Sequence, residues 1–512
     1  MTRPLNRPMI TLSIMLATIM QTLDSTIANV ALPHMQGSLS ASQDQIAWVL
    51  TAYIVAAAIA TPLTGWLVDR LGQKNLFLIT IAGFTIASML CGMSTSLAQI
   101  VAARLLQGVF GAALVPLSQV VLMDINPKEK QGSAMAVWGM GVMVGPILGP
   151  TLGGWLTDSY NWRWVFFINV PIGILAIFGV WKYMRPVRGA GRMRFDVFGF
   201  ATLSLAIGAL QLLLDRGQQN DWFSSTETRI EAIAAVVMST YFVAHTLMTP
   251  AHKSFVDFRL FKNQNFVTGV SFIFIVGLVL YATRALIPTM LETLLNYPVA
   301  TTGLVTAPSG VGTMLAMLIV GRLVGKIDLR LMLFVGFMLT AVALWQMAHY
   351  SLDLSQGDII WPGVIQGIGV GLVFVPLSAA TFATLSPEMR AQGTGVFSLV
   401  RNIGSSLGIS LVQTMLVRNT VIAHAALAER VTTANPAWHN PAVARAYDVG
   451  TLGGAALLDG AVTQQAAMIA YIDDFWLMLF LTLAVTPLLL LIRPPAKGKT
   501  AEADIATEAL ME

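Results

Sequence analysis

Four ionisable side chains lie inside long apolar stretches of this sequence: Asp24, Arg104, Arg284 and Arg401. A charged group in the hydrocarbon core of a bilayer is costly, so such a residue marks a functional site by default. A nearby arginine favours the ionised form of a carboxyl group and burial disfavours it, so a movement that separates the two changes the affinity for protons. These residue types favour proton binding, and a fixed ion pair that only joins two helices is the alternative.

Positions along the apolar stretches place Asp24 and Arg104 at a similar depth. Asp24 lies about nine residues before the proline that ends its stretch, and Arg104 lies about six residues inside its own. At about 1.5 Å per helical residue, both fall in the same half of the membrane and can pair. The candidates for a substrate cavity are Asn29, Gln107, Arg284 and Arg401.

The composition requires a membrane as the solvent. Of 512 residues, 55% are hydrophobic and 11% are charged, and the mean hydropathy is +0.71. Soluble proteins carry about 25% charged residues, so a water-soluble enzyme is excluded. The single cysteine, Cys91, excludes an internal disulfide and a cysteine-based metal site. The sequence has no phosphate-binding loop for ATP and no clustered metal ligands. We therefore expect no cofactor, no metal and no nucleic-acid partner.

Fourteen apolar runs predict fourteen transmembrane helices, because a span takes about 20 residues. They fall at 9–31, 46–68, 76–95, 99–122, 133–157, 164–181, 197–214, 230–249, 266–290, 300–324, 331–349, 359–382, 393–417 and 472–492. With this count, 21 of the 30 lysines and arginines lie on the side of the N-terminus and six on the other side. Since cytoplasmic loops carry the excess of basic residues, both termini are predicted to be cytoplasmic.

The sequence repeats itself at an offset of about 260 residues. Gln107 is echoed by Gln366, and Pro116 by Pro376. Two six-helix halves with two helices inserted between them explain this offset. Such parallel repeats, with substrate bound between them, indicate a transporter rather than an enzyme. The predicted parts are an N-terminal half at 1–182, two inserted helices at 183–262, and a C-terminal half at 263–512 with a long periplasmic loop at 418–471 and a cytoplasmic tail.

A charged turn closes the second apolar run, where the chain reads Gly65-Trp66-Leu67-Val68-Asp69-Arg70-Leu71-Gly72-Gln73-Lys74. Gly72 can accept the strained backbone of a tight turn, and Asp69 can face the N-terminus of a neighbouring helix. This stretch resembles the cytoplasmic signature of the major facilitator superfamily. The resemblance implies the major facilitator fold and a latch between the two halves. The latch residues would be Gly65, Asp69, Arg70, Gly72 and Lys74.

Glycines recur every four residues in the fifth run, at Gly141, Gly145, Gly149 and Gly153. Such a stripe lets another backbone approach closely. The run also contains Pro146, Pro150 and Gly154, and prolines bend a helix. It resembles the antiporter signature of drug-exporting members of the superfamily, and we interpret it as a hinge between the halves. Gly404 and Gly408 offer a smaller stripe in the repeat counterpart of this run.

The first run, from Leu23 to Pro33, resembles the first-helix motif of fourteen-helix drug:proton antiporters of the EmrB/QacA type. Residues 162–173 extend the resemblance over nearly the whole chain. The stretch after Arg104 is similar to the family's fourth-helix motif, whose arginine is tied to proton transfer. The resemblance implies a proton-coupled multidrug efflux transporter of the bacterial inner membrane that works by alternating access, with Asp24 and Arg104 carrying the coupling.

Partners and alternatives follow from the same patterns. Expected partners are hydrophobic or amphiphilic small molecules, protons and membrane lipids. Related exporters also work with a periplasmic adaptor and an outer-membrane channel, for which 418–471 is a candidate docking surface; a lid over the cavity is the alternative role for this segment. The alternative functions are a proton-coupled uptake carrier for a metabolite and an amphiphile or lipid flippase.

The buried arginines outnumber the buried aspartate. The apolar runs contain one acidic residue, Asp24, and three basic residues, Arg104, Arg284 and Arg401, so a surplus of positive charge lies in the membrane. This surplus favours anionic amphiphiles as substrates, because a cationic drug would be repelled. The alternative is that Glu292, Asp215 or a lipid headgroup neutralises the arginines.

Overall fold

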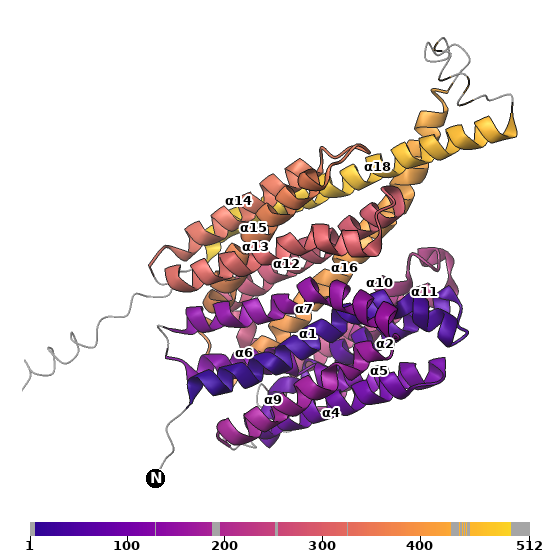
Figure 1. Ribbon diagram of the computed structural model, residues 1–512. Coiled ribbons are helices and arrows are strands. Elements are labelled where there is room, and N and C mark those ends of the chain that lie inside the picture. The colour runs from indigo at the N-terminus through magenta and orange to yellow at the C-terminus, as the bar shows by residue number, and fades with distance from the viewer. Residues whose placement is uncertain are drawn as a thin grey trace, which may run out of the picture.

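The computed structural model describes residues 6–127, 130–186, 195–250, 254–324, 326–431 and 451–492, with positions 440, 443, 445 and 447, as an all-helical chain (Figure 1). The helices used below are α1 (Arg7–Ser38), α2 (Gln43–Ala60), α3 (Leu63–Leu71), α4 (Gln73–Met93), α5 (Leu97–Gly111), α6 (Leu114–Ile125), α7 (Gln131–Ser159), α8 (Trp164–Phe167), α9 (Asn169–Tyr183), α10 (Val197–Arg216), α11 (Thr226–Met248), α12 (Gln264–Thr289), α13 (Val299–Leu323), α14 (Leu329–Met347), α15 (Gln356–Ala383), α16 (Pro387–Ala428) and α18 (Leu452–Val485).

All fourteen predicted runs fall on helices, so the all-α membrane class is confirmed. In the described part of the chain, thirteen spans are continuous by length and hydropathy, and α2 with α3 forms one more that is bent by 59°. The bend lies at Pro62, which lacks the N–H that a continuous helix needs. Gly72, at φ 76°, makes the tight turn predicted between α3 and α4.

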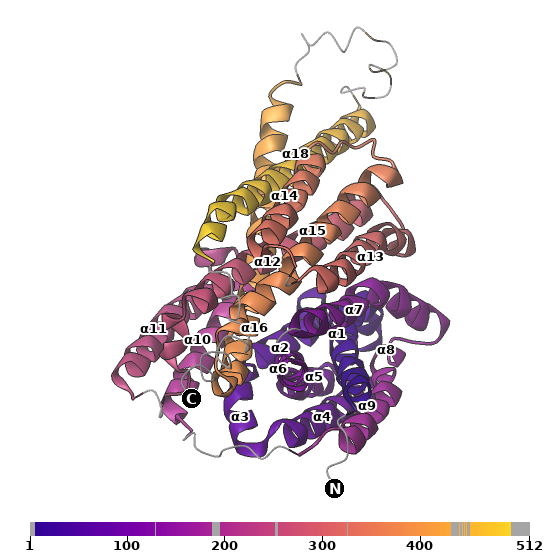
Figure 2. The same ribbon diagram turned by 90° about the vertical axis from the view of Figure 1, so that its left-hand side faces the viewer.

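The helix bundle has two ends, which we call the terminal end and the distal end (Figure 1). The terminal end is where α1 begins, and the distal end is where α16 and α18 project beyond the other helices. The helices before α10 pack mainly with one another, as do those from α12 onward; these are the N-terminal and C-terminal groups. The predicted boundaries at 182 and 262 stay predictions. The inserted helix α10 packs against α2 of one group and α16 of the other (Figure 2).

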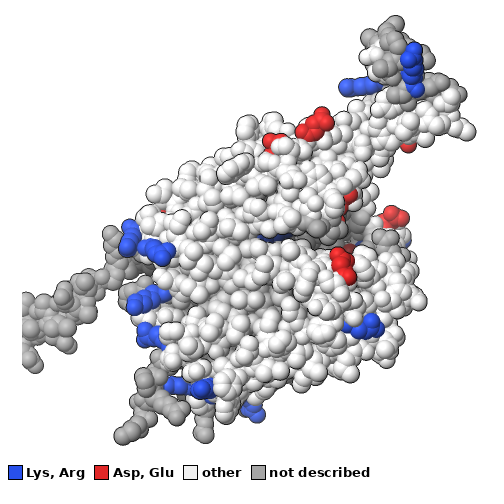
Figure 3. Space-filling view, viewed as in Figure 1, with Lys and Arg blue, Asp and Glu red and all other residues white. Residues whose placement is uncertain are grey.

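The two groups pack along α7 and α13, and polar contacts also join them at the terminal end. There α16 packs against α3 and α6, and Arg390 Nη1 lies 3.3 Å from Asp124 Oδ1. The Ser133 hydroxyl donates to the Gly321 carbonyl oxygen at 2.6 Å. Toward the distal end, α2 packs against α10 instead of α16, and the surface is hollowed between the groups (Figure 3). The structure is therefore closed at the terminal end and open at the distal end.

The predicted loop at 418–471 is wrong as a loop, because helices occupy most of it. α16 continues to Ala428 and α18 begins at Leu452. Two polar contacts join the projecting helices: His424 Nε2 lies 3.0 Å from Asp459 Oδ1, and Asn419 donates to Asp473 at 3.3 Å. Polar residues ended the hydropathy runs at this point, but a helix outside the membrane does not need to be apolar. The predicted tail after Ile492 lies outside the described residues.

Candidate functional site

Asp24 lies at the centre of a buried polar cluster inside the N-terminal group, with none of its surface exposed. Arg104 Nη1 donates to Asp24 Oδ2 at 2.7 Å. Gln107 and Asn169 each donate from the side-chain amide to Asp24 Oδ1 at 2.8 Å. Three donors from α5 and α9 thus stabilise the ionised carboxylate on α1, and hydrogen bonds to a charged group are the strong ones.

Arg104 is almost completely buried, with 1% of its surface exposed, and its guanidinium has several polar and aromatic contacts. Its Nε donates to the Val49 carbonyl oxygen of α2 at 3.0 Å, and Nη1 also donates to Gln107 Oε1 at 2.8 Å. The guanidinium lies over the Tyr53 ring, 4.3 Å from the ring centre. A buried charge that is both paired and hydrogen-bonded is tolerated, whereas the same charge without its partner is strongly destabilising.

Sequence reasoning missed Asn169 and Ser88 as members of this cluster. Asn169 Nδ2 also donates to the Ser88 hydroxyl at 2.9 Å, and that hydroxyl donates to the Phe166 carbonyl oxygen at 2.8 Å. Asn169 Oδ1 is buried with no partner. The available signal was an amide side chain inside an otherwise apolar run. These contacts bring α4 and α9 into the site.

The C-terminal group has an uncharged counterpart of the cluster. Gln366, the repeat mate of Gln107, donates to the Thr283 hydroxyl on α12 at 3.1 Å. Thr283 therefore stands where the N-terminal group has Asp24, and Arg284 is the next residue along the helix. Because Thr283 is neutral, the described residues place an ion pair at this position in the N-terminal group only.

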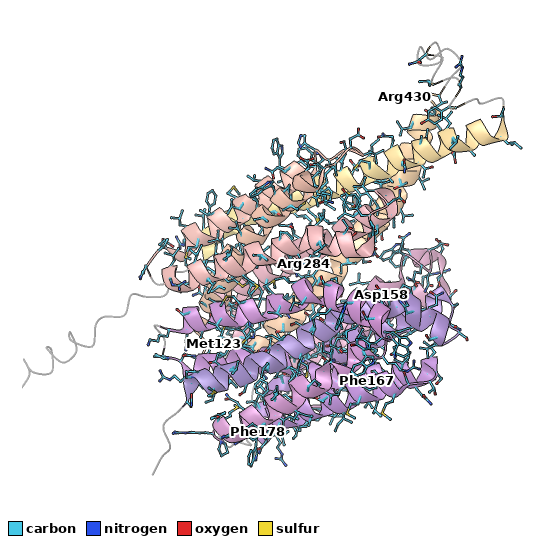
Figure 4. All side chains as sticks on the ribbon, in the orientation of Figure 1. Met123, Asp158, Phe167, Phe178, Arg284 and Arg430 are labelled. Carbon is cyan, nitrogen blue, oxygen red and sulfur yellow. The ribbon has the colours of Figure 1, made fainter. Side chains whose placement is uncertain are left out.

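Arg284 turns away from that counterpart toward the seam between the groups. Its Nη2 lies 3.4 Å from the sulfur of Met143 on α7, and Figure 4 shows the residue on α12 facing α7. Figure 3, in the same orientation, shows atoms of lysine or arginine at the seam between the groups. Arg284 is half-buried and none of the ion pairs of the described residues includes it.

Arg401 and Asn29 lie elsewhere. Arg401, half-buried on α16, donates to Asn402 at 3.4 Å, and its Nε is buried with no partner. Asn29 is exposed on α1, one turn and more from Asp24, and is not part of the polar cluster. Neither Glu292 nor Asp215 forms an ion pair with Arg284 or Arg401 in the described chain.

The predicted latch residues sit at the terminal end, and Gly65 lies directly against the other group. A Cβ added at Gly65 would lie 3.0 Å from Gln392 Cγ on α16. Lys74 instead donates to the Trp181 carbonyl oxygen at 2.7 Å, so it caps α9 within its own group. Asp69 and Arg70 lie on the last turn of α3, beside the turn at Gly72.

The charged link between the groups was missed in the sequence. Gln73, at the start of α4, donates to Asp124 Oδ2 at 2.7 Å, and Asp124 Oδ1 faces Arg390 across the seam. Gln392 Nε2 donates to the Phe255 carbonyl oxygen at 3.0 Å. Arg390 and Gln392 belong to the repeat of the segment around Pro127, and this repeat was the signal that could have identified them.

Loosening this link should shift the transporter away from the closed terminal end. In Asp124→Lys, two positive charges face each other where an attraction worth up to about 1 kcal/mol existed. We expect a cysteine at position 136, where the alanine is 3% exposed and faces Gly321 of α13, to be labelled about fivefold more by a permeant maleimide, since 1 kcal/mol is a factor of about five. The charge-swapped pair Asp124→Lys with Arg390→Asp should restore the original labelling. Equal labelling in all three proteins would contradict the role of this pair.

The glycine stripe of α7 faces α1, and the hinge role of these residues stays a prediction. A Cβ on Gly145 would overlap the Thr22 backbone, and one on Gly149 would overlap Thr26. Thr26 also donates to the Gly145 carbonyl oxygen at 3.0 Å. Gly141 and Gly153 face α1 in the same way, so the whole stripe packs within the N-terminal group against the segment that carries Asp24.

The opposite face of α7 makes the contact between groups. A Cβ on Gly139 would meet Met317 of α13, and one on Gly310 of α13 would meet Ile147. Pro146 and Pro150 lie inside α7, and a Cβ on Gly303 of α13 would lie 3.9 Å from Pro150 Cβ. α7 therefore connects the Asp24 segment of α1 to the seam. Gly404 and Gly408 of α16 correspond to the glycine stripe of α7, because each packs against the backbone of α12 within the C-terminal group.

The arrangement directs three donors at one buried carboxylate. Proton uptake at Asp24 would remove the charge that three donors now share and would leave Arg104 unpaired. Among the described residues, no three histidine, cysteine, aspartate or glutamate side chains are grouped so that they could hold a metal ion.

Sequence comparisons show which proteins this chain is similar to. A family model described as Major Facilitator Superfamily matches residues 14–409. The fatty acid resistance protein FarB of Neisseria gonorrhoeae is 37% identical over 491 residues, which are 95% of this chain and 96% of that protein. The multidrug export protein EmrB of Escherichia coli (strain K12) is 36% identical over 495 residues, 95% of each chain.

A comparison of structures gives the same fold at much lower identity. The crystal structure of the human organic anion transporter TETRAN superposes with a TM-score of 0.59. It covers 94% of this chain and 100% of its own, at 13% sequence identity.

Proposed function

The chain belongs to the major facilitator superfamily and is a drug-efflux transporter within it, and we propose that proton uptake at Asp24 drives the efflux. The observation that carries the proposal is the buried pair of Asp24 and Arg104, 2.7 Å apart within membrane spans. Ionisable residues inside a membrane span are costly and rare, so such a pair marks a functional site by default.

Coupling would pass from the pair to the seam through two helices. When Asp24 takes up a proton, its attraction to Arg104 is lost, and α1 is free to move relative to α5. The Thr22 to Ile27 segment of α1 is packed against the bare glycines of α7. Because α7 also packs against α13 of the other group, a shift of α1 changes the contact between the groups.

The proposed orientation places the terminal end in the cytoplasm and the chain in the inner membrane of a bacterium. The surplus of basic residues on that side supports it through the positive-inside rule. With this orientation, the hollow in Figure 3 faces outward, and the closed terminal end separates it from the cytoplasm. The structure then represents the outward-facing state of an alternating-access cycle.

We propose hydrophobic anions as the preferred substrates, with Arg284 as the group that binds the anion. Arg284 is half-buried at the seam, is free of carboxylate partners among the described residues, and lies beside the apolar Met143. The name of the relative from Neisseria gonorrhoeae refers to fatty acids, whose carboxylate and apolar tail match this pairing.

The test compares an anion with a cation in proteoliposomes under an imposed pH gradient. Arg284→Ala should weaken transport of decanoate roughly 10- to 100-fold, since a hydrogen bond to a charged group is worth about 1.5–3 kcal/mol, and it should leave ethidium transport unchanged or improved. Arg284→Lys keeps the charge and should retain most of the decanoate transport. An unchanged ratio of decanoate to ethidium transport in Arg284→Ala would remove Arg284 from substrate choice.

The projecting hairpin of α16 and α18 is the surface that we propose for a periplasmic adaptor, which would lead on to an outer-membrane channel. Val421 and Leu457 are 65% and 63% exposed there, and large apolar side chains exposed together mark interaction sites. A photo-crosslinker at position 457 should capture an adaptor subunit in cells. Crosslinking that is equally strong from position 345, an exposed tryptophan of α14, would contradict docking on the hairpin.

A further inference from the structure

The C-terminal group contains a buried carboxyl group that has no part in the cluster around Asp24. Asp474 lies on α18 with none of its surface exposed, and both of its carboxyl oxygens are buried with no hydrogen-bond partner. Its neighbours on α18, Tyr471, Phe475 and Met478, belong to the apolar core of this group. An ionised carboxylate in such a place is strongly unfavourable unless a partner compensates its charge.

The adjacent acid has the opposite surroundings. Asp473 is exposed, and its Oδ2 accepts a hydrogen bond from Asn419 of α16 at 3.3 Å. Consecutive residues of a helix point in different directions, so one acid faces the surface and the other faces the core. The pair provides a matched comparison between a solvated and a buried aspartate at the same depth.

Asp474 interacts electrostatically with Asp473 and Tyr471 of its own helix. α18 packs against α12, α14, α16 and the π-helical turn at Met290–Leu294. These elements and the turn after α14 carry ten charged or titratable side chains with described positions. None of the ten makes an ion pair or hydrogen bond with Asp474. They are Tyr281, Arg284, Glu292, Arg330, His349, Tyr350, Arg390, Arg401, Arg418 and His424. The carboxyl group therefore has no basic partner.

A polar route leads from Asp474 toward the distal surface. Tyr471 lies one turn before Asp474 on α18, and its hydroxyl interacts with the side chain of Thr293. Thr293 is exposed and lies on the π-helical turn. Single π-helical turns occur often at functional sites. A hydroxyl that lies between an exposed and a buried polar group can pass a proton between them.

Asp474 also lies close to the uncharged counterpart of the Asp24 cluster. Met478, one turn further along α18, contacts the Thr283 hydroxyl through its sulfur at 3.5 Å. Thr283 accepts the hydrogen bond from Gln366, as Asp24 does from Gln107. The C-terminal group thus keeps the amide of the cluster on α15 and carries a fully buried carboxyl group on α18.

We propose that Asp474 is a second proton-binding site of the transporter, loaded from the distal side through Tyr471. The carboxylate takes up one proton from water at the distal end and becomes a neutral carboxyl group, and it returns this proton when the groups change their arrangement. The proposal rests on proton-driven efflux, because only a proton cycle uses a second site.

Infrared spectroscopy of the purified protein in lipid vesicles tests the site without any transport. The wild type should show the carbonyl stretch of a protonated carboxyl group at acidic pH, and this band should disappear as the pH rises. Asp474→Asn should lose the band, and Asp473→Asn should retain it. Asp474→Glu keeps an acid at this place and should shift the band without abolishing its titration, which decides the matter if Asp474→Asn does not fold.

Transport in proteoliposomes then tests the use of the site. The number of protons taken up per exported decanoate should be halved in Asp474→Asn, and Tyr471→Phe should slow proton uptake without changing this number. A band that does not titrate, a band that survives in Asp474→Asn, or an unchanged proton count would overturn the proposal. If the wild type showed no pH-driven export, proton coupling itself would be overturned, while the infrared result for Asp474 would stand.

Discussion

Asp24→Asn is expected to abolish pH-driven efflux and to lower the free energy of unfolding by about 3–5 kcal/mol, because it leaves the buried Arg104 without its counter-charge. Asparagine has nearly the shape of aspartate, so the loss comes from the charge and not from packing. Thermal unfolding of the purified protein measures the second effect, and decanoate efflux from proteoliposomes under a pH gradient measures the first.

Two further variants separate the stability effect from the coupling effect. Asp24→Asn combined with Arg104→Gln removes both charges, so it should recover most of the lost stability and none of the coupled efflux. Asp158→Asn removes an exposed carboxylate at the distal end of α7 (Figure 4) and should behave as the wild type in both measurements. Efflux that still follows the pH gradient in Asp24→Asn would exclude this residue from coupling and would leave the ion pair a purely structural role.

Gly145→Ala is expected to destabilise the N-terminal group and to reduce efflux more than tenfold. An alanine Cβ at this position would overlap the Thr22 backbone, and a backbone cannot move aside as the end of a side chain can. Overpacking of this kind costs about 1–3 kcal/mol. It would also push α1 away from α7 beside Asp24, where the proposed coupling needs the two helices in contact.

Gly154→Ala on the same helix is the matched control. The nearest atom to an added Cβ there is Val30 Cγ1, at 4.0 Å, which is ordinary contact. Replacing glycine by alanine inside a helix otherwise stabilises it by up to about 1 kcal/mol. The two substitutions should therefore shift the melting temperature in opposite directions. A Gly145→Ala protein as stable and active as Gly154→Ala would show that the stripe does not hold the two helices together.

Much of the fold could be predicted because its signals are local. Each apolar run, each basic loop and each charge inside a run is visible in a short window, and the bilayer imposes a fixed length on every span. The same reasoning placed Asp24 and Arg104 at one depth, where they lie 2.7 Å apart. The error at 418–471 had the opposite cause, since a helix that leaves the membrane loses the apolar signal but keeps its hydrogen bonds.

The rest depended on how each helix is rotated about its axis and which helices lie beside it. The sequence by itself determined a multi-pass helical protein with a repeat, a buried acid–arginine pair and a glycine stripe. Only the tertiary structure decided that the stripe faces α1, that Asn169 completes the site from 145 residues away, that Asp124 meets Arg390 across the seam, and that Asp474 points into a core while Asp473 does not. Depth in a membrane follows from polarity along the chain, but rotation and neighbours follow from side-chain packing, which no local window contains.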